Sequence, residues 1–183
     1  MENIKNNNYA IEQRVMLDCT VDGNERKKQY ICLNDIVLAK GTLARMAKYE
    51  IYIDGRFYSS FTADGVIVST PTGSTAYSLS AGGPIMYPTL KLMSITPICP
   101  HSLGVRTIVI DGSSKVQIAI KQKYESVFLT VDGQQSLELK EEDKITVSMA
   151  PYKCKLIKLS SYDYFSILRQ KITSRTKQCE GDK

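Results

Sequence analysis

Apolar and polar residues alternate over most of the chain, in short stretches that predict β-strands. An alternation with a period of two residues is typical of a strand that buries one face. The first stretch has apolar residues at every second position, namely Val15, Leu17, Cys19 and Val21. Further stretches of this kind predict strands within 29–39, 49–53, 57–61, 105–110, 116–120, 127–131, 137–139, 145–149 and 153–159.

Asp-Gly dipeptides separate many of these stretches. They stand at Asp22-Gly23, Asp54-Gly55, Asp64-Gly65, Asp111-Gly112 and Asp132-Gly133. Asp-Gly between two strands favours a hairpin, because both residues tolerate the positive φ that such a turn requires. We therefore expect hairpin turns at four of them. Asp64-Gly65 is the exception, because a hydroxyl-rich turn follows it.

The remaining segments predict few helices. Residues 41–48 form a connection, and 93–99 is a short apolar piece cut by Pro97 and Pro100. Helical spacing of Tyr162, Phe165, Leu168 and Ile172 predicts a C-terminal helix with Ser160 or Ser161 as its cap. The polar residues 173–183 are expected to be disordered. The chain is thus predicted to be mainly β, an antiparallel β-sandwich-like domain with a few short helices and a C-terminal helix.

One stretch departs from this pattern. Val66–Val68 suits a buried strand, and Ser69–Thr75 then brings five hydroxyl side chains within seven residues. A short helix is predicted to follow, with Thr72 or Ser74 as its cap. Gly82-Gly83-Pro84 would end this helix.

The chemistry of this stretch leaves two interpretations open. Backbone N–H groups and hydroxyls that converge at a helix N-terminus suit a phosphate or a polyhydroxylated ligand, with Asp64 at the entrance. A loop that uses its hydroxyls to cap a helix is the structural alternative. A P-loop is excluded, because no Lys-Ser/Thr pair follows Gly73.

Composition and charge fit one soluble domain. The chain has 183 residues, of which 43% are hydrophobic and 23% charged, enough for a single core. A net charge of +5 without a basic cluster interleaved with aromatics argues against nucleic-acid binding. Five cysteines without a Cys-x-x-Cys pair indicate reduced thiols in a cytoplasmic protein, and a single histidine disfavours a zinc site. No signal peptide and no membrane-spanning run are predicted.

The residues 64–77, Asp-Gly-Val-Ile-Val-Ser-Thr-Pro-Thr-Gly-Ser-Thr-Ala-Tyr, followed by Gly82-Gly83-Pro84, resemble the signature of the NAD kinase family. Asn34-Asp35 is similar to the family's Asn-Glu pair at a strand end, with aspartate for the usual glutamate. The likeness covers about residues 11–172 and is to the family's C-terminal domain. The family's N-terminal domain carries Gly-Gly-Asp-Gly-Thr, whose aspartate is held to be the catalytic base. These 183 residues contain no such segment, so the catalytic residue stays unknown.

The resemblance implies the enzyme NAD kinase, which phosphorylates the adenosine ribose 2′-hydroxyl of NAD to give NADP. The phosphate donor would be ATP, with Mg²⁺ or another divalent cation, or polyphosphate. Residues 1–172 would form the NAD-binding domain, without a metal site of their own. Asn34 and Asp35 would hold the adenosine portion, and Asp64 would bond a ribose. The implied substrate-binding residues are Asn34, Asp35, Asp64, Thr75, Ala76, Tyr77, Ser80 and Asp132.

Alternatives remain for the function and for single residues. The chain could be a non-catalytic dinucleotide-binding or oligomerisation module, or an inactive fragment. A relative of the diacylglycerol and sphingosine kinases is disfavoured by the complete signature and by Asn34-Asp35. Tyr77 could stack on a ring or pack in the core, and His101 is expected to be structural. The expected partners are NAD, ATP or polyphosphate, and further copies of the chain in a homo-oligomer. A separately encoded N-terminal domain is a further candidate partner.

Overall fold

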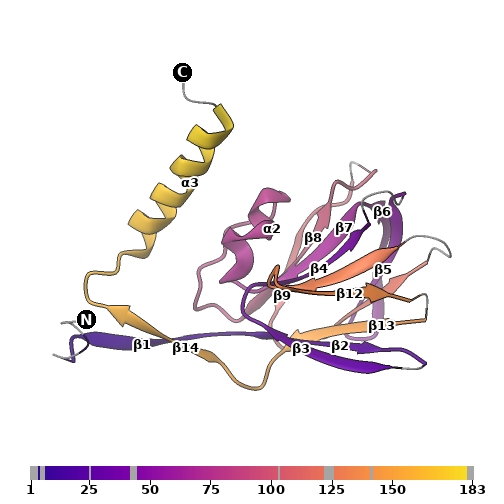
Figure 1. Ribbon diagram of the computed structural model, residues 1–183, viewed down its shortest axis with the longest axis horizontal. Helices are drawn as coiled ribbons and strands as arrows, with labels where there is room; N and C mark the ends of the chain where they lie inside the picture. Colours follow the sequence, from indigo (N-terminus) through magenta and orange to yellow (C-terminus); the bar gives the residue numbers. More distant parts are fainter. Residues whose placement is uncertain are drawn as a thin grey trace. The chain divides into compact units, whose positions relative to one another are not determined.

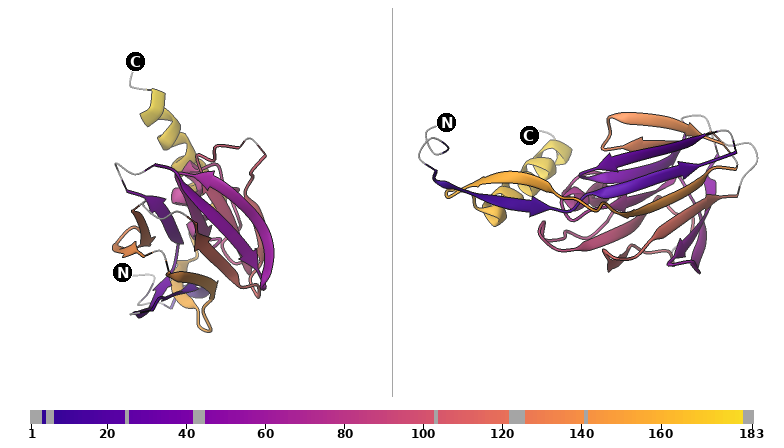
Figure 2. Two further views of the ribbon diagram at one scale, coloured as in Figure 1. Left: turned by 90° about the vertical axis from the view of Figure 1, so that its right-hand side faces the viewer. Right: turned by 90° about the horizontal axis from the view of Figure 1, so that it is seen from below.

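A computed structural model of the chain describes residues 4, 7–24, 26–41, 45–102, 104–121, 126–140 and 142–180. The chain divides into two compact units, residues 13–154 and residues 1–12 together with 155–183. The larger unit contains two six-stranded sheets, which Figures 1 and 2 show as layers of arrows. The smaller unit contains most of a two-stranded sheet and one helix.

The strands of both large sheets pair antiparallel throughout. The first sheet has the spatial order β3 (Lys27–Cys32), β2 (Leu17–Asp22), β13 (Lys144–Met149), β10 (Val116–Ile120), β5 (Ala47–Ile53) and β6 (Arg56–Ala63). The second sheet has the spatial order β12 (Gln135–Leu139), β11 (Val127–Val131), β4 (Asp35–Lys40), β7 (Gly65–Ser69), β8 (Leu92–Ile98) and β9 (Ile108–Asp111).

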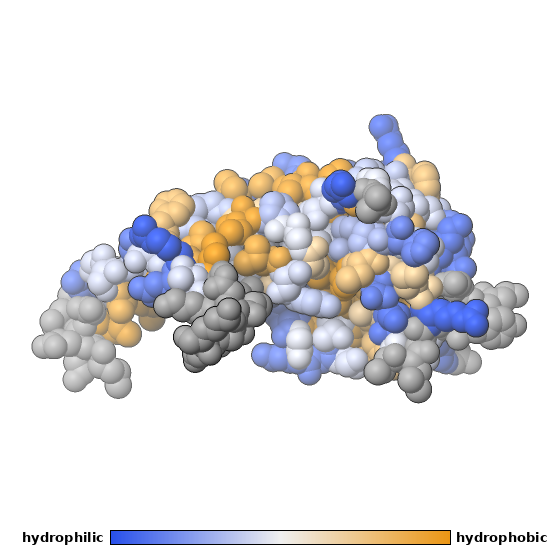
Figure 3. Space-filling view, turned by 90° about the horizontal axis from the view of Figure 1, so that it is seen from above, coloured by the Kyte–Doolittle hydropathy of each residue, from blue (hydrophilic) through white to orange (hydrophobic). Residues whose placement is uncertain are grey.

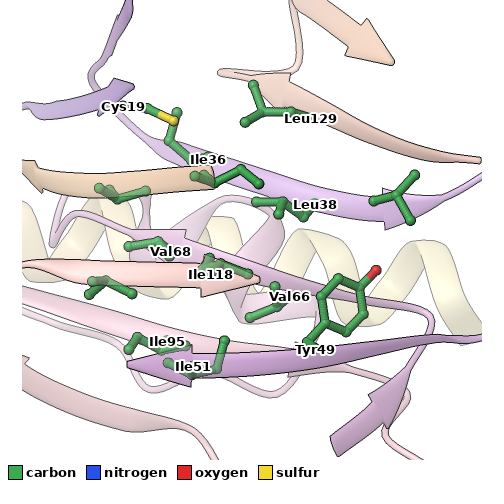
Figure 4. Packing of buried hydrophobic residues seen from close by; sticks show 14 of the residues in the cluster. Cys19, Ile36, Leu38, Tyr49, Ile51, Val66, Val68, Ile95, Ile118 and Leu129 are labelled. Carbon is green, nitrogen blue, oxygen red and sulfur yellow. The ribbon is translucent and has the colours of Figure 1, made fainter. Parts of the chain in front are cut away.

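The main core lies between these two sheets. Cys19, Tyr49 and Ile118 of the first sheet belong to the same buried cluster as Leu38 and Leu129 of the second. Figure 4 shows such side chains from both layers directed toward one another. The alternation in the sequence arises because every second residue of these strands enters this core. The predicted antiparallel β-sandwich is therefore confirmed.

A smaller apolar cluster lies on the outer face of the second sheet. It consists of Val37, Ile67 and Ile98, with Ala39 and Ala81 packed against it. Val37 and Ile67 occupy paired positions of β4 and β7 and point away from the main core, since Ile36 and Val68 beside them belong to it. The segment after β7, with the 3-10 helix η1 (Gly73–Thr75) and α2 (Tyr77–Ser80), covers part of this face. Figure 1 shows α2 beside the second sheet.

The chain crosses from the first sheet to the second at Leu33 and Asn34. The prediction of one strand over 29–39 is therefore wrong, because β3 ends at Cys32 and β4 begins at Asp35 in the other sheet. The alternation continues through the break, with Tyr30 and Cys32 on one side and Ile36 on the other. Asn34 occupies the position between them where an apolar residue would be expected, which is the signal that marks the crossing.

Three other predictions are corrected. The Asp111-Gly112 dipeptide is not a hairpin, because β9 and β10 belong to different sheets. Strand β8 continues through Pro97, since β9 pairs only with Leu92–Ile95 and leaves Pro97 beside one neighbour among the described strands. Residues 47–48 belong to β5 rather than to a connection, and 42–44 lie outside the described residues. The hairpins at Asp54-Gly55 and Asp132-Gly133 are confirmed, with positive φ at all four residues.

Most of the sheet of β1 (Tyr9–Arg14) and β14 (Cys154–Leu159) belongs to the smaller unit, as does the helix α3 (Tyr164–Glu180). The predicted helix exists, but its first turn is capped by Asp163, whose carboxylate accepts the N–H of Phe165 at 3.0 Å. The helix continues past Thr173, where disorder was expected, because its 17 residues include no glycine or proline that would end it. In the described part of the chain, none of the helices combines the length and apolar character that a membrane span requires.

Candidate functional site

The hydroxyl-rich segment after β7 is held by its own side chains. Ser69, Thr70 and Ser74 are fully buried. The Thr70 hydroxyl donates to the carbonyl of Leu33 at 2.6 Å and accepts the N–H of Gly73 at 3.0 Å. The Ser74 hydroxyl donates to the carbonyl of Pro71 at 2.7 Å and accepts the N–H of Met86 at 3.0 Å. These hydroxyls therefore hold the backbone of the loop, which is a structural role, but they do not cap the helices as the structural alternative predicted.

The predicted helix caps are wrong for the same reason. Thr72 precedes η1 without a side-chain capping bond, and its hydroxyl instead accepts a hydrogen bond from Arg14 at 3.4 Å. Ser74 lies inside η1, and Ala76 stands at the cap position of α2. Buried donors and acceptors require partners, so tertiary contacts determine where these hydroxyls bind.

Gly73 brings this segment into direct contact with the chain crossing. A Cβ atom at residue 73 would lie 2.1 Å from the carbonyl oxygen of Asn34, so only glycine fits there. The N–H of Thr70 also donates to this carbonyl, at 2.9 Å. The segment after β7 therefore packs on the backbone of Asn34.

A pocket of about 390 Å³ opens beside this contact, on the outer face of the second sheet. Its lining residues come from the chain crossing, β4, the start of α2, β11 and the β11–β12 turn, and they are Asn34, Asp35, Val37, Ala39, Ala76, Tyr77, Thr130, Asp132 and Gly133. The structure thus brings together five of the eight residues predicted from the sequence: Asn34, Asp35, Ala76, Tyr77 and Asp132. It adds Val37, Ala39, Thr130 and Gly133.

Strand geometry explains two of the residues that the sequence analysis missed. Asp35, Val37 and Ala39 occupy alternate positions of β4 and so share one face of the strand. The same period-two argument that predicts the core could have placed Val37 and Ala39 beside Asp35. Thr130 pairs with Val37 across β11 and β4, a contact that depends on strand order and has no local signal.

Three predicted site residues do not line the pocket. Thr75 and Ser80 lie in η1 and α2, close in sequence to Ala76 and Tyr77. Asp64 precedes β7, whereas the hydroxyl-rich segment follows it, so the whole strand separates them. Its carboxylate pairs with the ammonium group of Lys40 at 3.4 Å, near the end of β4 that is remote from Asp35. Asp64 is thus not at the entrance of the segment, and its role as a ribose ligand stays a prediction.

The Asp132 carboxylate is engaged by the backbone of the chain crossing. One oxygen accepts the N–H groups of Asn34 at 2.7 Å and Asp35 at 3.1 Å, and the other accepts the N–H of Leu33 at 2.9 Å. The N–H of Asp132 donates to the carbonyl of Asp35 at 3.1 Å. Asp132 reaches this position from the β11–β12 turn, where its φ is +49°.

Asp35 is a buried carboxyl group in the wall of the pocket, with 4% of its surface exposed. Burial, followed by the negative charge of Asp132, raises the pKa of Asp35 to about 6, although a backbone hydrogen bond from Tyr77 opposes this shift. A carboxyl group in a pocket with a pKa raised in this way is a common feature of functional sites.

The pocket has the chemistry of a site for hydroxyl groups and a flat ring. Its lining residues, as far as the structure describes them, include two carboxyl groups and no lysine, arginine or histidine. Carboxylates accept hydrogen bonds from paired hydroxyls, and an asparagine amide can both donate and accept. The side-chain amide of Asn34 has no hydrogen-bond partner in the described part of the chain. Tyr77 is 47% exposed and leaves a ring face available for stacking.

Apolar side chains are also exposed along the chain that follows β7, at Tyr77, Ile85, Tyr87 and Leu90. Figure 3 shows apolar patches among polar residues on one face of the molecule.

His101 is exposed, and its backbone N–H donates to the carbonyl of Thr62 at 2.9 Å. No group of three His, Cys, Asp or Glu side chains suited to a metal ion occurs among the described residues.

Fold and pocket together define a class of protein, a β-sandwich domain with a pocket suited to a polyhydroxylated ligand. Residues 33–159 match the ATP-NAD kinase C-terminal domain, and the chain belongs to this family. It is 52% identical over 182 residues to the NAD kinase of Clostridium botulinum (strain ATCC 19397 / Type A) and 47% identical over 183 residues to that of Clostridium beijerinckii (strain ATCC 51743 / NCIMB 8052). Both matches cover 100% of this chain and 64% of the relative.

Solved structures agree with this assignment. The crystal structure of yeast NADH kinase complexed with NADH has a TM-score of 0.85 and 32% identity, and the match covers 92% of this chain and 50% of the yeast chain. The NAD kinase from Archaeoglobus fulgidus in complex with ATP shares the fold, with a TM-score of 0.77 and 24% identity over 94% of this chain and 64% of that chain. The family predicted from the sequence is thus confirmed, and the chain spans 64% of the length of the two clostridial relatives.

The substitution Gly73→Ala tests the contact between Gly73 and Asn34. We expect the free energy of unfolding to fall by about 3 kcal/mol, the upper end of the range for overpacking, because the new methyl group would overlap a backbone oxygen. Urea denaturation measures the change. Gly104→Ala is the control, since a Cβ atom there would meet nothing closer than the Ser102 hydroxyl at 3.9 Å. Equal losses in the two variants would contradict the close approach at residue 73.

The substitution Asp35→Asn tests the buried carboxyl group. Because the pKa of Asp35 is about 6 in the folded chain and 3.8 in its unperturbed form, the folded chain binds more protons between these values, and its stability falls as the pH rises through this window. The amide carries no charge, so the variant should melt a few degrees above the wild type at pH 7.5 and lose this advantage at about pH 4. Calorimetry at both pH values measures the difference in melting temperature, with the exposed Asp22→Asn as control. A variant that is less stable at pH 7.5 would refute the assignment.

Proposed function

We propose that this chain supplies the NAD-binding domain of an NAD kinase, which transfers a phosphoryl group from ATP or polyphosphate to the 2′-hydroxyl of the adenosine ribose of NAD. The observation that carries the proposal is the polar end of the pocket, where Asn34, Asp35 and Tyr77 line one cavity. Membership of the ATP-NAD kinase C-terminal domain family supports it. The yeast relative of known structure is complexed with NADH, a dinucleotide with the same ribose groups.

Each group in the pocket has a defined task in this proposal. The Asp35 carboxylate accepts hydrogen bonds from ribose hydroxyls, and the Asn34 amide bonds a base edge or a ribose oxygen. Tyr77 stacks on a ring of the dinucleotide. Thr75 and Ser80 contact the ligand beyond the pocket, and Asp64 bonds a ribose only after a change in its surroundings, because the structure pairs it with Lys40.

The phosphate donor and its metal ion bind with little help from this domain. The A. fulgidus relative is in complex with ATP, which supports ATP as donor. The described residues do not fit a metal site of their own, so Mg²⁺ would reach the reaction with the phosphates of ATP, as it commonly does in kinases. We further propose a cytoplasmic location, in agreement with the free thiols of Cys19 and Cys32. A homo-oligomer is proposed from the family resemblance alone.

A second candidate is a module that binds the dinucleotide without phosphoryl transfer. The contacts of Asp132 favour it, because both oxygens of its carboxylate already accept backbone N–H groups and have little capacity left for a substrate hydroxyl. Of the two carboxyl groups that line the pocket, Asp35 is the one that would bind the dinucleotide in this second candidate.

Calorimetric titration of the chain with NAD tests the proposal, with Asn34→Ala as the site variant. We expect the wild type to bind and the variant to bind at least about tenfold more weakly, because the loss of one hydrogen bond to a ligand costs about 1.4 kcal/mol or more. Asn24→Ala, an exposed asparagine between β2 and β3, is the matched control and should bind as the wild type does.

The same samples separate the two candidates. NADP formed with NAD, ATP and Mg²⁺ would establish a kinase, and binding without NADP would leave the binding module. A wild-type chain that does not bind NAD, or equal binding by Asn34→Ala, would contradict the site assignment.

A further inference from the structure

Both oxygens of the Asp132 carboxylate are used by the protein itself. Three consecutive N–H groups, those of Leu33, Asn34 and Asp35, donate to it at 2.7–3.1 Å. Hydrogen bonds to a charged acceptor are among the stronger ones in proteins. Asp132 lines the pocket, but its carboxylate has little remaining capacity for a ligand. The resemblance implied that Asp132 binds the substrate directly, and this contact pattern favours a different role.

The carbonyl groups of the same three residues are held from the other side. Thr70 donates its hydroxyl to the carbonyl of Leu33 at 2.6 Å and its N–H to the carbonyl of Asn34 at 2.9 Å. The N–H of Asp132 donates to the carbonyl of Asp35 at 3.1 Å. Every backbone polar group of Leu33–Asp35 thus has a partner in Asp132 or Thr70. This segment belongs to no regular strand pairing until β4 begins, so these two residues determine its conformation.

We propose that Asp132 is a positioning residue for the dinucleotide site: its carboxylate holds the backbone of Leu33–Asp35 so that Asn34 and Asp35 face the pocket, and it makes no bond to the ligand. The identity of the ligand as a dinucleotide rests on the proposed function. The positioning of Asn34 and Asp35 does not, because it can be observed in the free protein.

The charge of Asp132 acts on Asp35 as well. The groups that face the Asp35 carboxyl are Asp132 from the β11–β12 turn, the backbone N–H of Tyr77 from α2, and the buried thiol of Cys32 from β3. Asp132 is the charged group among them, and its negative charge raises the pKa of Asp35. A neutral residue at 132 should therefore lower the pH at which Asp35 ionises. A residue that only supported the fold would not produce this shift.

The test compares the wild type with Asp132→Asn, which keeps the size of the side chain and tolerates positive φ. Hydrogen exchange of the Leu33, Asn34 and Asp35 amides should be at least about tenfold faster in the variant, because an amide side chain cannot accept three N–H groups as a carboxylate does. Carbon-13 NMR of the Asp35 carboxyl should show a titration midpoint near pH 6 in the wild type and a lower midpoint in the variant. Neither measurement requires a ligand.

Asp54→Asn is the matched control. Asp54 also begins an Asp-Gly hairpin turn at positive φ, and its carboxylate accepts one N–H, from Lys115 at 2.8 Å. This variant should leave both the exchange at 33–35 and the Asp35 midpoint unchanged. Thr70→Val provides a second comparison, since it releases the same backbone without a change of charge and should leave the Asp35 midpoint near that of the wild type.

The outcomes are separable from those of the proposed function. If the wild type binds NAD, Asp132→Asn should bind it at least about tenfold more weakly. If the wild type does not bind NAD, the proposed function fails for this chain, and the exchange and titration data still decide the positioning role. Fast exchange of the three amides in the wild type itself would overturn the proposal even if the variant does not fold. An unchanged Asp35 midpoint in a folded Asp132→Asn would also overturn it.

Discussion

The backbone of Leu33–Asp35 has to connect two sheets and support one end of a pocket at the same time. A chain that leaves one sheet for another gives up its ladder hydrogen bonds, and buried backbone groups without partners are costly. In this protein Asp132 supplies acceptors for the three N–H groups, and Thr70 supplies donors for two of the carbonyls. The segment after β7 can then pack on Asn34 through Gly73. The pocket, the crossing and the covering segment all depend on this one set of hydrogen bonds.

The same arrangement has a cost in stability. It leaves Asp35 buried beside a second negative charge, which a fold selected for stability alone would avoid. A ligand that donates hydroxyl hydrogen bonds would compensate this carboxylate. The two neighbouring carboxyl groups of the free pocket therefore favour a diol, which donates hydrogen bonds, over a phosphate, which is negatively charged. This agrees with a site for the ribose portion of a dinucleotide. The outer face of β4, with Val37 and Ala39, supplies the apolar wall that such a ligand also needs.

The sequence predicts the layers of this fold well because the alternation of apolar and polar residues within each strand shows which of its faces is buried. Alternation over residues such as Cys19, Leu38 and Leu129 is local information, and the core uses it directly. The bond from the Thr70 hydroxyl to Leu33 was missed, because the two residues lie 37 positions apart in the chain. The crossing was missed although polar Asn34, at a position where the alternation calls for an apolar residue, marks it. For the pocket, the resemblance to the family led to Asn34, Asp35, Ala76, Tyr77 and Asp132, which the structure brings together. It could not show that Asp132 faces the backbone, since a carboxylate that binds a ligand and one that binds an N–H group look the same in a sequence.

A crystal structure of the chain with NAD would test the central claim most directly. We expect a dinucleotide in the pocket, with ribose hydroxyls bonded to Asp35, a contact from the Asn34 amide, and the Asp132 carboxylate still bonded to the N–H groups of Leu33–Asp35. A dinucleotide bound elsewhere, or an Asp132 carboxylate that has left the backbone to bond the ligand, would contradict it.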